Sequence, residues 1–328
     1  MWNPPYFIIN DIGVYCEIII HLSFLSEQQY MLTSHYGELA ALLTALFWTI
    51  TALAFEGATK KVGALSVNII RLVFGFLFLT TLSWFQRGLF LPLDASAHAW
   101  FWLMLSGFVG LMMGDLFLFA SYPIIGSRIA MLMMTLAPPL AAILGWIILG
   151  ESMSLLSIAG MFFVLLGIGL VIWSRPGGNG KMQLNFPIRG LFYAFMGAVG
   201  QAGGLVLSKF GMKDYNPFAA TQIRIIAATI GFVILISILR RWGNVLKALK
   251  HKKAMRGVTI GSFFGPFLGV SFSLIAIKYT STGIASTLMS IVPVLIIVPS
   301  VVFLKQKVSL KEIIGAVISV LGVSLFFL

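Results

Sequence analysis

The chain has little of what catalytic and metal-binding sites are made of. Its 328 residues include a single cysteine, Cys16, which excludes an internal disulfide and a metal site built on cysteines. The four histidines, His21, His35, His98 and His251, fall outside the long apolar segments, and no Ser/His/Asp grouping or phosphate-binding loop accompanies them. We therefore expect no enzyme activity, no cofactor and no metal site.

Charge is also scarce. Charged residues make up 10% of the chain and hydrophobic residues 59%, whereas soluble domains carry about a quarter charged residues. The net charge of +12 does not indicate nucleic acid, because the cations lie in short loops between apolar segments. Lipid is the expected surrounding of this protein, and nucleic acid is not an expected partner.

Long apolar segments dominate what is present. A helix needs about 20 mostly apolar residues to cross a bilayer, and helices satisfy their own backbone groups in hydrocarbon. No period-2 alternation favours a barrel. The expected fold class is an all-α integral membrane protein with ten transmembrane helices. The predicted spans are 37–56, 65–85, 99–120, 127–149, 154–173, 188–208, 217–239, 257–277, 283–304 and 309–327.

The second half of the chain repeats the first. Arg71 and Arg224 are 153 residues apart, and after a short insertion Pro138 and Pro293 are 155 apart. Paired arginines and prolines at such constant spacing rarely arise by chance. Because each copy holds five spans, an odd number, the two copies cross the membrane in opposite directions, as in many transporters.

This repeat defines the expected organisation of the chain. The first 34 residues have no counterpart in the second copy, which leaves two explanations: a start codon upstream of the true one at Met31, or an interfacial helix over 5–25. The expected parts are an N-terminal extension over 1–34, a first repeat over 35–175 (spans one to five), a linker over 176–187 and a second repeat over 188–328 (spans six to ten).

Matching interruptions in the two repeats indicate where a substrate would bind. Pro138 and Pro293 fall near the middle of spans four and nine, where a proline leaves a helix carbonyl without its amide donor. Interruptions at equivalent positions are the best sequence pointer to the midplane site of such transporters. A packing kink without ligand contact is the alternative.

Spans one and six each carry polar, aromatic and small residues on one helical face. This pattern predicts either a cavity wall or an ordinary seam between helices, whereas Glu38 and Glu56, at the two ends of span one, are expected to be hydrated. The two matched faces are Thr44, Trp48, Thr51 and Phe55, and Gly197, Gln201, Gly204 and Ser208.

Three further charged residues, Asp115, Arg71 and Arg224, are candidates for a functional role within the spans. Asp115 adjoins Gly114 in a glycine-rich segment of span three that predicts close helix packing. An intramembrane carboxylate is a candidate for proton coupling or cation contact, with hydration at a span end as the alternative. Arg71 and Arg224 either snorkel to the nearer interface or bind helix carbonyls or an anionic substrate group.

We expect a cavity at the midplane through which substrate passes by alternating access, either coupled to protons through Asp115 or by facilitated diffusion. Its predicted lining residues are Trp48, Thr51, Asp115, Met134, Pro138, Gln201, Phe264, Ser271, Ser290 and Pro293.

The chain resembles a known family. Trp48, Arg71 and Arg224, together with the runs SRIAMLMMTLAPPLAAILGWIILGE over 127–151 and STGIASTLMSIVPVLIIVPSVVFLKQK over 281–307, are similar to the EamA-type permeases of the drug/metabolite transporter superfamily, over roughly 35–328. The resemblance implies export or exchange of small metabolites such as amino acids, nucleosides or cationic drugs, and export is the direction we expect. It also implies a cavity among spans one, three, four, six, eight and nine, with five and ten outside.

Some features depart from the family or leave its implications open. Span four ends in Glu151, but span nine ends in Lys305-Gln306, so a mechanism with symmetric carboxylates is not expected. Loops after odd-numbered spans hold most of the lysines and arginines, which places the termini outside a plasma (bacterial inner) membrane, whereas many family members are drawn with cytoplasmic termini.

Several alternatives remain at this stage. A flippase for a lipid-linked sugar or other amphiphile would use Arg71 or Arg224 for an anionic headgroup, and a membrane scaffold or sensor would transport nothing. The paired glycines of spans five and ten, Gly160 and Gly167 with Gly315 and Gly322, support either a homodimer or packing within one chain.

Overall fold

The structure, a computed structural model, describes residues 35–149, 155–174, 183–184, 186–280, 285, 288–305 and 308–325. The extension over 1–34 and most of the linker over 176–187 lie outside the described residues. The described part is helical except for short connections and two paired two-residue strands, β1 and β2.

The described elements follow one another as α-helices interrupted at three places by π-helical or 3₁₀ segments. They are α2 (Tyr36–Val62), α3 (Ala64–Arg87), α4 (Ala97–Ser106), π-helix η1 (Gly107–Gly114), α5 (Asp115–Met133), 3₁₀ helix η2 (Met134–Leu136), α6 (Ala137–Leu149), α7 (Leu155–Ile172), β1 (Trp173–Ser174), β2 (Gln183–Leu184), α8 (Ile188–Met212), α9 (Pro217–Ile238), α10 (Trp242–Leu249), α11 (Lys252–Ser262), π-helix η3 (Phe263–Gly269), α12 (Val270–Tyr279), α14 (Val292–Leu295), α15 (Ile297–Leu304) and α16 (Leu310–Ser324).

Length and composition make the described part a membrane protein. Six helical stretches are long and apolar enough to cross a bilayer, and two shorter apolar helices accompany them. The six are Tyr36–Val62, Ala64–Arg87, Ala97–Leu144, Ile188–Met212, Pro217–Ile238 and Lys252–Tyr279, and the shorter two are Ile158–Ile172 and Val292–Val302.

The longest of these stretches is broken at Gly126. Ala97–Leu144 has 48 residues, far more than the roughly 20 that one crossing needs. Gly126 has φ 77° and ψ 159°, so the helix stops there and a new one begins at Ser127. A left-handed φ of this kind suits glycine because glycine has no Cβ. The break separates the predicted spans three and four at the expected place.

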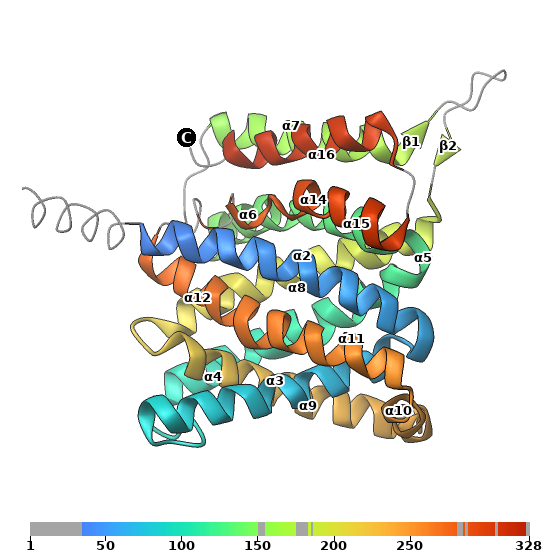
Figure 1. Cartoon of the computed structure of the whole chain (residues 1–328). Helices are drawn as coiled ribbons and strands as arrows, with labels where there is room; N and C mark the ends of the chain where they lie inside the picture. Colours follow the sequence, from blue (N-terminus) through green and yellow to red (C-terminus); the bar gives the residue numbers. More distant parts are fainter. Residues whose placement is uncertain are drawn as a thin grey trace, which may run out of the picture.

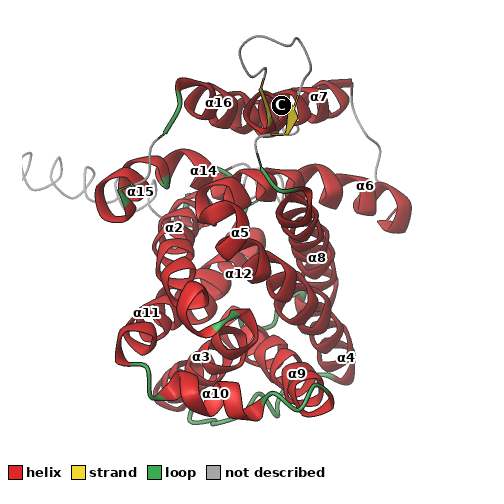
Figure 2. Cartoon of the chain, turned by 90° about the vertical axis from the view of Figure 1, so that its right-hand side faces the viewer, coloured by secondary structure: helices red, strands yellow, loops and turns green. Residues whose placement is uncertain are grey.

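The helices lie in layers. In Figures 1 and 2, α7 and α16 form a pair at one edge of the molecule, and α3, α4, α9 and α10 lie at the opposite edge. The helices α2, α5, α8 and α12 lie between these edges (Figure 2). The central helices are therefore covered by other helices on two sides.

The glycines of α7 and α16 pack within the chain. A Cβ on Gly167 would come 2.5 Å from the carbonyl oxygen of Gly315, and one on Gly322 would come 2.7 Å from the amide nitrogen of Val164. Small residues let the two backbones approach this closely. In this structure these glycines pack within one chain, which is one of the two roles predicted for them. Their helices expose large apolar side chains such as Phe162 and Leu321 on the outside.

A second glycine contact joins the two halves of the chain. A Cβ on Gly200 would come 2.5 Å from the Cα of Gly114, and one on Gly204 would come 2.8 Å from the Cα of Gly110. Beside them the Ser106 hydroxyl donates to the Gly204 carbonyl at 2.6 Å and lies 2.7 Å from the Ser208 hydroxyl. Gly204 and Ser208 of the span-six face therefore form a seam, as one of the two interpretations predicted.

Local signals in the sequence set where helices begin. Asn216 caps α9, its side-chain oxygen accepting from the amides of Phe218 and Ala219, and Pro217 follows at the first helical position. The Ser309 hydroxyl accepts from the Glu312 amide at 3.3 Å and caps α16. These caps satisfy amide groups that the helix itself leaves unpaired.

Candidate functional site

One cavity lies among helices from both halves of the chain. The centres of water molecules can occupy about 120 Å³ of it, several times what a single water needs. Its described walls come from α2, α3, η1, α5, η2, α6 and, in the second half, α8, α9, η3, α12 and the segment 289–293; α7 and α16 contribute none of the described lining residues.

Eight of the ten residues predicted to line a cavity lie in the wall of this one. They are Trp48, Thr51, Asp115, Met134, Pro138, Gln201, Ser290 and Pro293.

The other two predicted lining residues, Phe264 and Ser271, are not in the cavity wall. Phe264 packs instead against Phe47 and Phe263, with ring centroids 5.7 and 5.3 Å apart. Ser271 is buried in the protein, and its hydroxyl has no hydrogen-bond partner in the described part. The reason for the error is the π-helix η3, because i to i+5 bonding changes which side chains share a helix face. Gly265 and Pro266 line the cavity in their place.

Arg71 and Asp115 form a buried ion pair in the cavity wall. Arg71 Nη2 lies 2.6 Å from Asp115 Oδ2, and the two side chains are 3% and 15% exposed. Arg71 also donates to the Leu111 carbonyl at 3.1 Å and, through Nε, to Asn68 Oδ1 at 2.9 Å. Its guanidinium lies 4.8 Å from the centre of the Phe119 ring. Arg71 therefore does not snorkel, and Asp115 is paired with it in the cavity wall.

Arg224 is buried in the same wall but is bonded differently. Arg224 is 3% exposed, and its Nε has no hydrogen-bond partner in the described part of the chain. Asp115 attracts it electrostatically, without an ion pair between these two residues within 4 Å. Snorkelling, one of the two alternatives for the arginines, is therefore excluded for Arg224 too. Arg71 and Arg224 lie in the wall of the same cavity.

The rest of the wall is mostly apolar. Trp48 and Phe55 of α2 face it together with Phe119 and Tyr122 of α5, and methionines 131, 134 and 289 complete much of the surface. The Thr51 hydroxyl, also in the wall, is a buried polar group without a hydrogen-bond partner among the described residues. Such a wall suits a small molecule with an apolar body and few polar groups.

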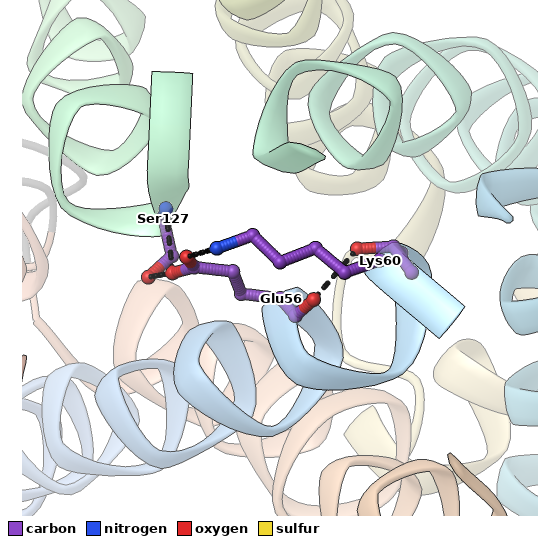
Figure 3. A network of polar contacts seen from close by, with 4 residues as sticks. Glu56, Lys60 and Ser127 are labelled. Carbon is purple, nitrogen blue, oxygen red and sulfur yellow. Dashed lines mark hydrogen bonds and ion pairs between the residues drawn. The ribbon is translucent and has the colours of Figure 1, made fainter. Parts of the chain in front are cut away.

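A buried carboxylate near one end of α2 holds the broken helix in place (Figure 3). Glu56 is 0% exposed, and its Oε2 accepts from the Ser127 amide at 2.9 Å and from the Ser127 hydroxyl at 2.5 Å. Its Oε1 pairs with Lys60 Nζ at 2.5 Å. A carboxylate at a new helix N-terminus satisfies an unpaired amide and complements the helix dipole. The helix that begins at Ser127 leads to the cavity residues Met131 and Met134.

The prediction of a hydrated Glu56 was therefore wrong. The predicted span ended at residue 56, but α2 continues to Val62, so Glu56 lies more than a turn inside the helix. Glu38, at the other end, is partly exposed, and the Thr280 hydroxyl donates to its Oε1 at 2.7 Å. A sequence signal for Glu56 did exist: the dipeptide Gly126-Ser127 after Pro123 marks a helix restart that needs a cap.

The sequence and the structure are similar to known proteins. The model of the EamA-like transporter family matches residues 35–173 and again 188–328. An uncharacterized transporter of Archaeoglobus fulgidus is 25% identical over 297 residues, which are 88% of this chain and 97% of that protein. A second uncharacterized transporter of the same organism is 25% identical over 115 residues, 35% of this chain and 39% of that protein.

The fold is also found in a solved structure. A crystal structure described only as that of a protein has a TM-score of 0.60 and 18% sequence identity, and the match covers 88% of this chain and 95% of that one. The two family matches end and begin on either side of the linker predicted over 176–187, and together they span nearly all of the described residues. The chain belongs to the EamA-like transporter family and is a membrane transporter.

Proposed function

We propose that the protein moves a small metabolite, of the size of an amino acid or a nucleoside, across the plasma membrane in the direction of export. In this proposal the chain crosses the membrane ten times as two inverted five-helix repeats, the first over 35–175 and the second over 188–328. The observation that carries it is the cavity described above, whose wall both halves build and which has buried charges inside.

Matched helix interruptions beside the cavity support alternating access. Pro138 follows the 3₁₀ segment η2, and Pro293 stands at the start of α14 after a turn, so both repeats break their helix where they meet the cavity. The π-helices η1 and η3 provide a second matched pair. Equivalent weak points in two inverted repeats let one repeat rock against the other around a fixed site.

Proton coupling, in this proposal, acts through Asp115 alone. Asp115 is the only carboxylate among the described residues that line the cavity. The variant Asp115→Asn cannot titrate there. In the protein that remains folded, it is therefore expected to remove any pH dependence of transport and to leave facilitated transport in place. Uptake into proteoliposomes over a range of pH measures both effects.

A ligand screen tests the proposed function. The purified protein is heated in detergent with amino acids, nucleosides, sugars and cationic drugs, because a ligand that binds only the folded state raises the melting temperature. Each ligand that raises it is then assayed for transport in proteoliposomes. A stabilising ligand that is also transported is the expected result.

Two tryptophan variants show whether such a ligand binds in the cavity. Trp48→Ala removes part of the cavity wall, whereas Trp84→Ala removes an exposed ring that stacks on Phe90 outside it. Stabilisation lost in Trp48→Ala and kept in Trp84→Ala supports the proposal. Equal stabilisation of both variants, or a bound ligand that is never transported, contradicts it.

A further inference from the structure

The two arginines of the cavity are equivalent in the repeat but not in their bonding. Arg71 and Arg224 occupy the same position in the two halves, 153 residues apart. Arg71 bonds to Asp115, Asn68 and the Leu111 carbonyl. Arg224 is equally buried, yet its side chain makes none of these bonds, and its Nε is left without a hydrogen-bond partner in the described part of the chain.

The repeat itself explains the difference. The position equivalent to Asp115, 155 residues later, is Val270, which lines the cavity. The position equivalent to Asn68 is Thr221, whose hydroxyl donates back to its own helix at the Pro217 carbonyl, at 2.8 Å. The second half therefore keeps the arginine and lacks both side chains that satisfy it in the first half.

A buried guanidinium without a partner is expensive, because removing one member of a buried ion pair leaves an uncompensated charge. The cavity wall holds two arginines and one carboxylate among its described residues, which gives it one net positive charge. The Arg71–Asp115 pair already neutralises the other two charges. One negative charge from outside the chain would balance the wall.

We propose that the transported metabolite is an organic anion with a single carboxylate and an apolar body, and that its carboxylate binds Arg224 as Asp115 binds Arg71. This inference rests on the proposed transport function and names the class of substrate. A guanidinium matches a carboxylate with two parallel hydrogen bonds. The aromatic and methionine side chains of the wall contact the apolar body, and the unpaired Thr51 hydroxyl is a further donor.

The geometry also argues that the substrate has a net charge of minus one. An uncharged nucleoside would leave Arg224 unpaired, and a zwitterionic amino acid would add a positive group to a wall that already has an excess of positive charge. An inorganic anion would neutralise Arg224 but would leave the apolar wall without a partner. These three ligand classes are therefore the comparisons that test the inference.

The first experiment measures binding to the full-length protein in detergent. A panel of monocarboxylates with apolar chains of different lengths is compared with their primary amides, which have the same shape and no charge, and with sodium chloride at equal ionic strength. We expect the acids to raise the melting temperature, their amides to do so far less, and chloride not at all. We also expect Arg224→Gln to weaken acid binding by roughly 10- to 100-fold.

A second pair of variants keeps Arg224 in place. Val270→Asp supplies Arg224 with the carboxylate that the first repeat has, whereas Val270→Asn has nearly the same size and no charge. We expect Val270→Asp to fold and to lose acid binding, because its own carboxylate occupies Arg224, and Val270→Asn to keep acid binding. These two variants show whether the acid binds Arg224, even if Arg224→Gln does not fold.

The outcomes separate this inference from the proposed function. Amides or nucleosides that bind as tightly as the acids, or acid binding unaffected by Arg224→Gln and Val270→Asp, would overturn the carboxylate inference, while transport of those neutral ligands would leave the transporter assignment intact. Amino acids that bind more tightly than the matching acids would overturn the inference that the substrate has a net charge of minus one. Chloride that raises the melting temperature as much as the acids do would overturn the inference that the substrate is an organic anion.

Discussion

Arg71 of α3 and Asp115 at the start of α5 are joined by an ion pair of 2.6 Å that is almost entirely withdrawn from the surface. Asn68 ties the same pair together, because it accepts from Arg71 and its amide donates to the Asp115 carbonyl at 3.3 Å. The pair holds two helices of the first half in register beside the cavity. In the second half the Nε of the equivalent arginine, Arg224, has no hydrogen-bond partner among the described residues.

Loss of Asp115 should destabilise the fold. Asp115→Asn leaves Arg71 buried without its counter-charge, and breaking such pairs costs about 3–5 kcal/mol. We expect a lower midpoint of denaturant unfolding in detergent micelles. The double variant Arg71→Met/Asp115→Leu, which removes both charges, should recover part of the loss, and a single variant as stable as the wild type would show that the pair is not structural.

Gly107 should tolerate no side chain. A Cβ there would lie 2.2 Å from the backbone carbonyl oxygen of Arg224, so Gly107→Ala forces α9 away from η1. We expect lower stability and weaker ligand binding at the cavity. Gly57→Ala is the control, because a Cβ on Gly57 meets nothing within 4 Å and alanine favours a helix by up to about 1 kcal/mol. Equal melting temperatures for the two variants would contradict the close contact.

The Glu56 carboxylate should be needed for the helix that restarts at Ser127. Glu56→Ala leaves the Ser127 amide and hydroxyl without their acceptor, and an unsatisfied buried polar group costs about 1–3 kcal/mol. Lys61→Ala, an exposed change at the same end of α2, should cost less than about 0.5 kcal/mol. The comparison is made by thermal unfolding of both purified variants, and equal costs would argue against the cap.

Tyr215 should make stability depend on alkaline pH. Its hydroxyl donates to Asp94 Oδ1 at 2.9 Å, and burial followed by this hydrogen bond raises the pKa of Tyr215 to about 12. The same bond, with the Arg87 contact, outweighs the burial of Asp94 and lowers the pKa of Asp94. The cluster joins the loop after α3 to the loop after α8.

The sign of the effect follows from the raised pKa of Tyr215. The unfolded chain loses the tyrosine proton near pH 10, whereas the folded protein keeps it to about 12. The stabilisation is complete below pH 10 and is lost as pH rises through about 12. We expect unfolding midpoints measured between these values to fall less steeply for Tyr215→Phe than for the wild type. Parallel curves would show that Tyr215 does not contribute.

Much of the architecture could be predicted because lipid imposes simple rules. Apolar length located the helical stretches, and the repeat placed Arg71, Arg224, Pro138 and Pro293 in matching positions, all of which line the cavity. Spans five and ten were expected at the periphery, and their helices, α7 and α16, form the outer pair in Figure 1. The helical stretches and the matched positions depend on composition and spacing, which a single sequence contains, whereas the place of spans five and ten was implied by the family resemblance.

The errors arose where local geometry departs from a regular α-helix. Phe264 and Ser271 were expected in the cavity wall, but Phe264 lies in the π-helix η3 and Ser271 just after it, where side chains do not follow α-helical spacing. Glu56 was assigned to a hydrated end because hydropathy alone does not show that α2 continues to Val62. The depth of Arg71 and Arg224 depended on tertiary packing against η1, which no pattern within their own helices reveals.

The central claim, that this cavity opens alternately to the two sides of the membrane, is tested most directly by thiol accessibility. Gln201→Cys places a thiol in the cavity wall, and Ala198→Cys places one on the same helix in the fully buried core, each in a Cys16→Ser background that has no other cysteine. A membrane-impermeant thiol reagent is applied to vesicles of either orientation. The account predicts labelling of Gln201→Cys from both sides and of Ala198→Cys from neither, whereas labelling of Gln201→Cys from one side alone would contradict alternating access.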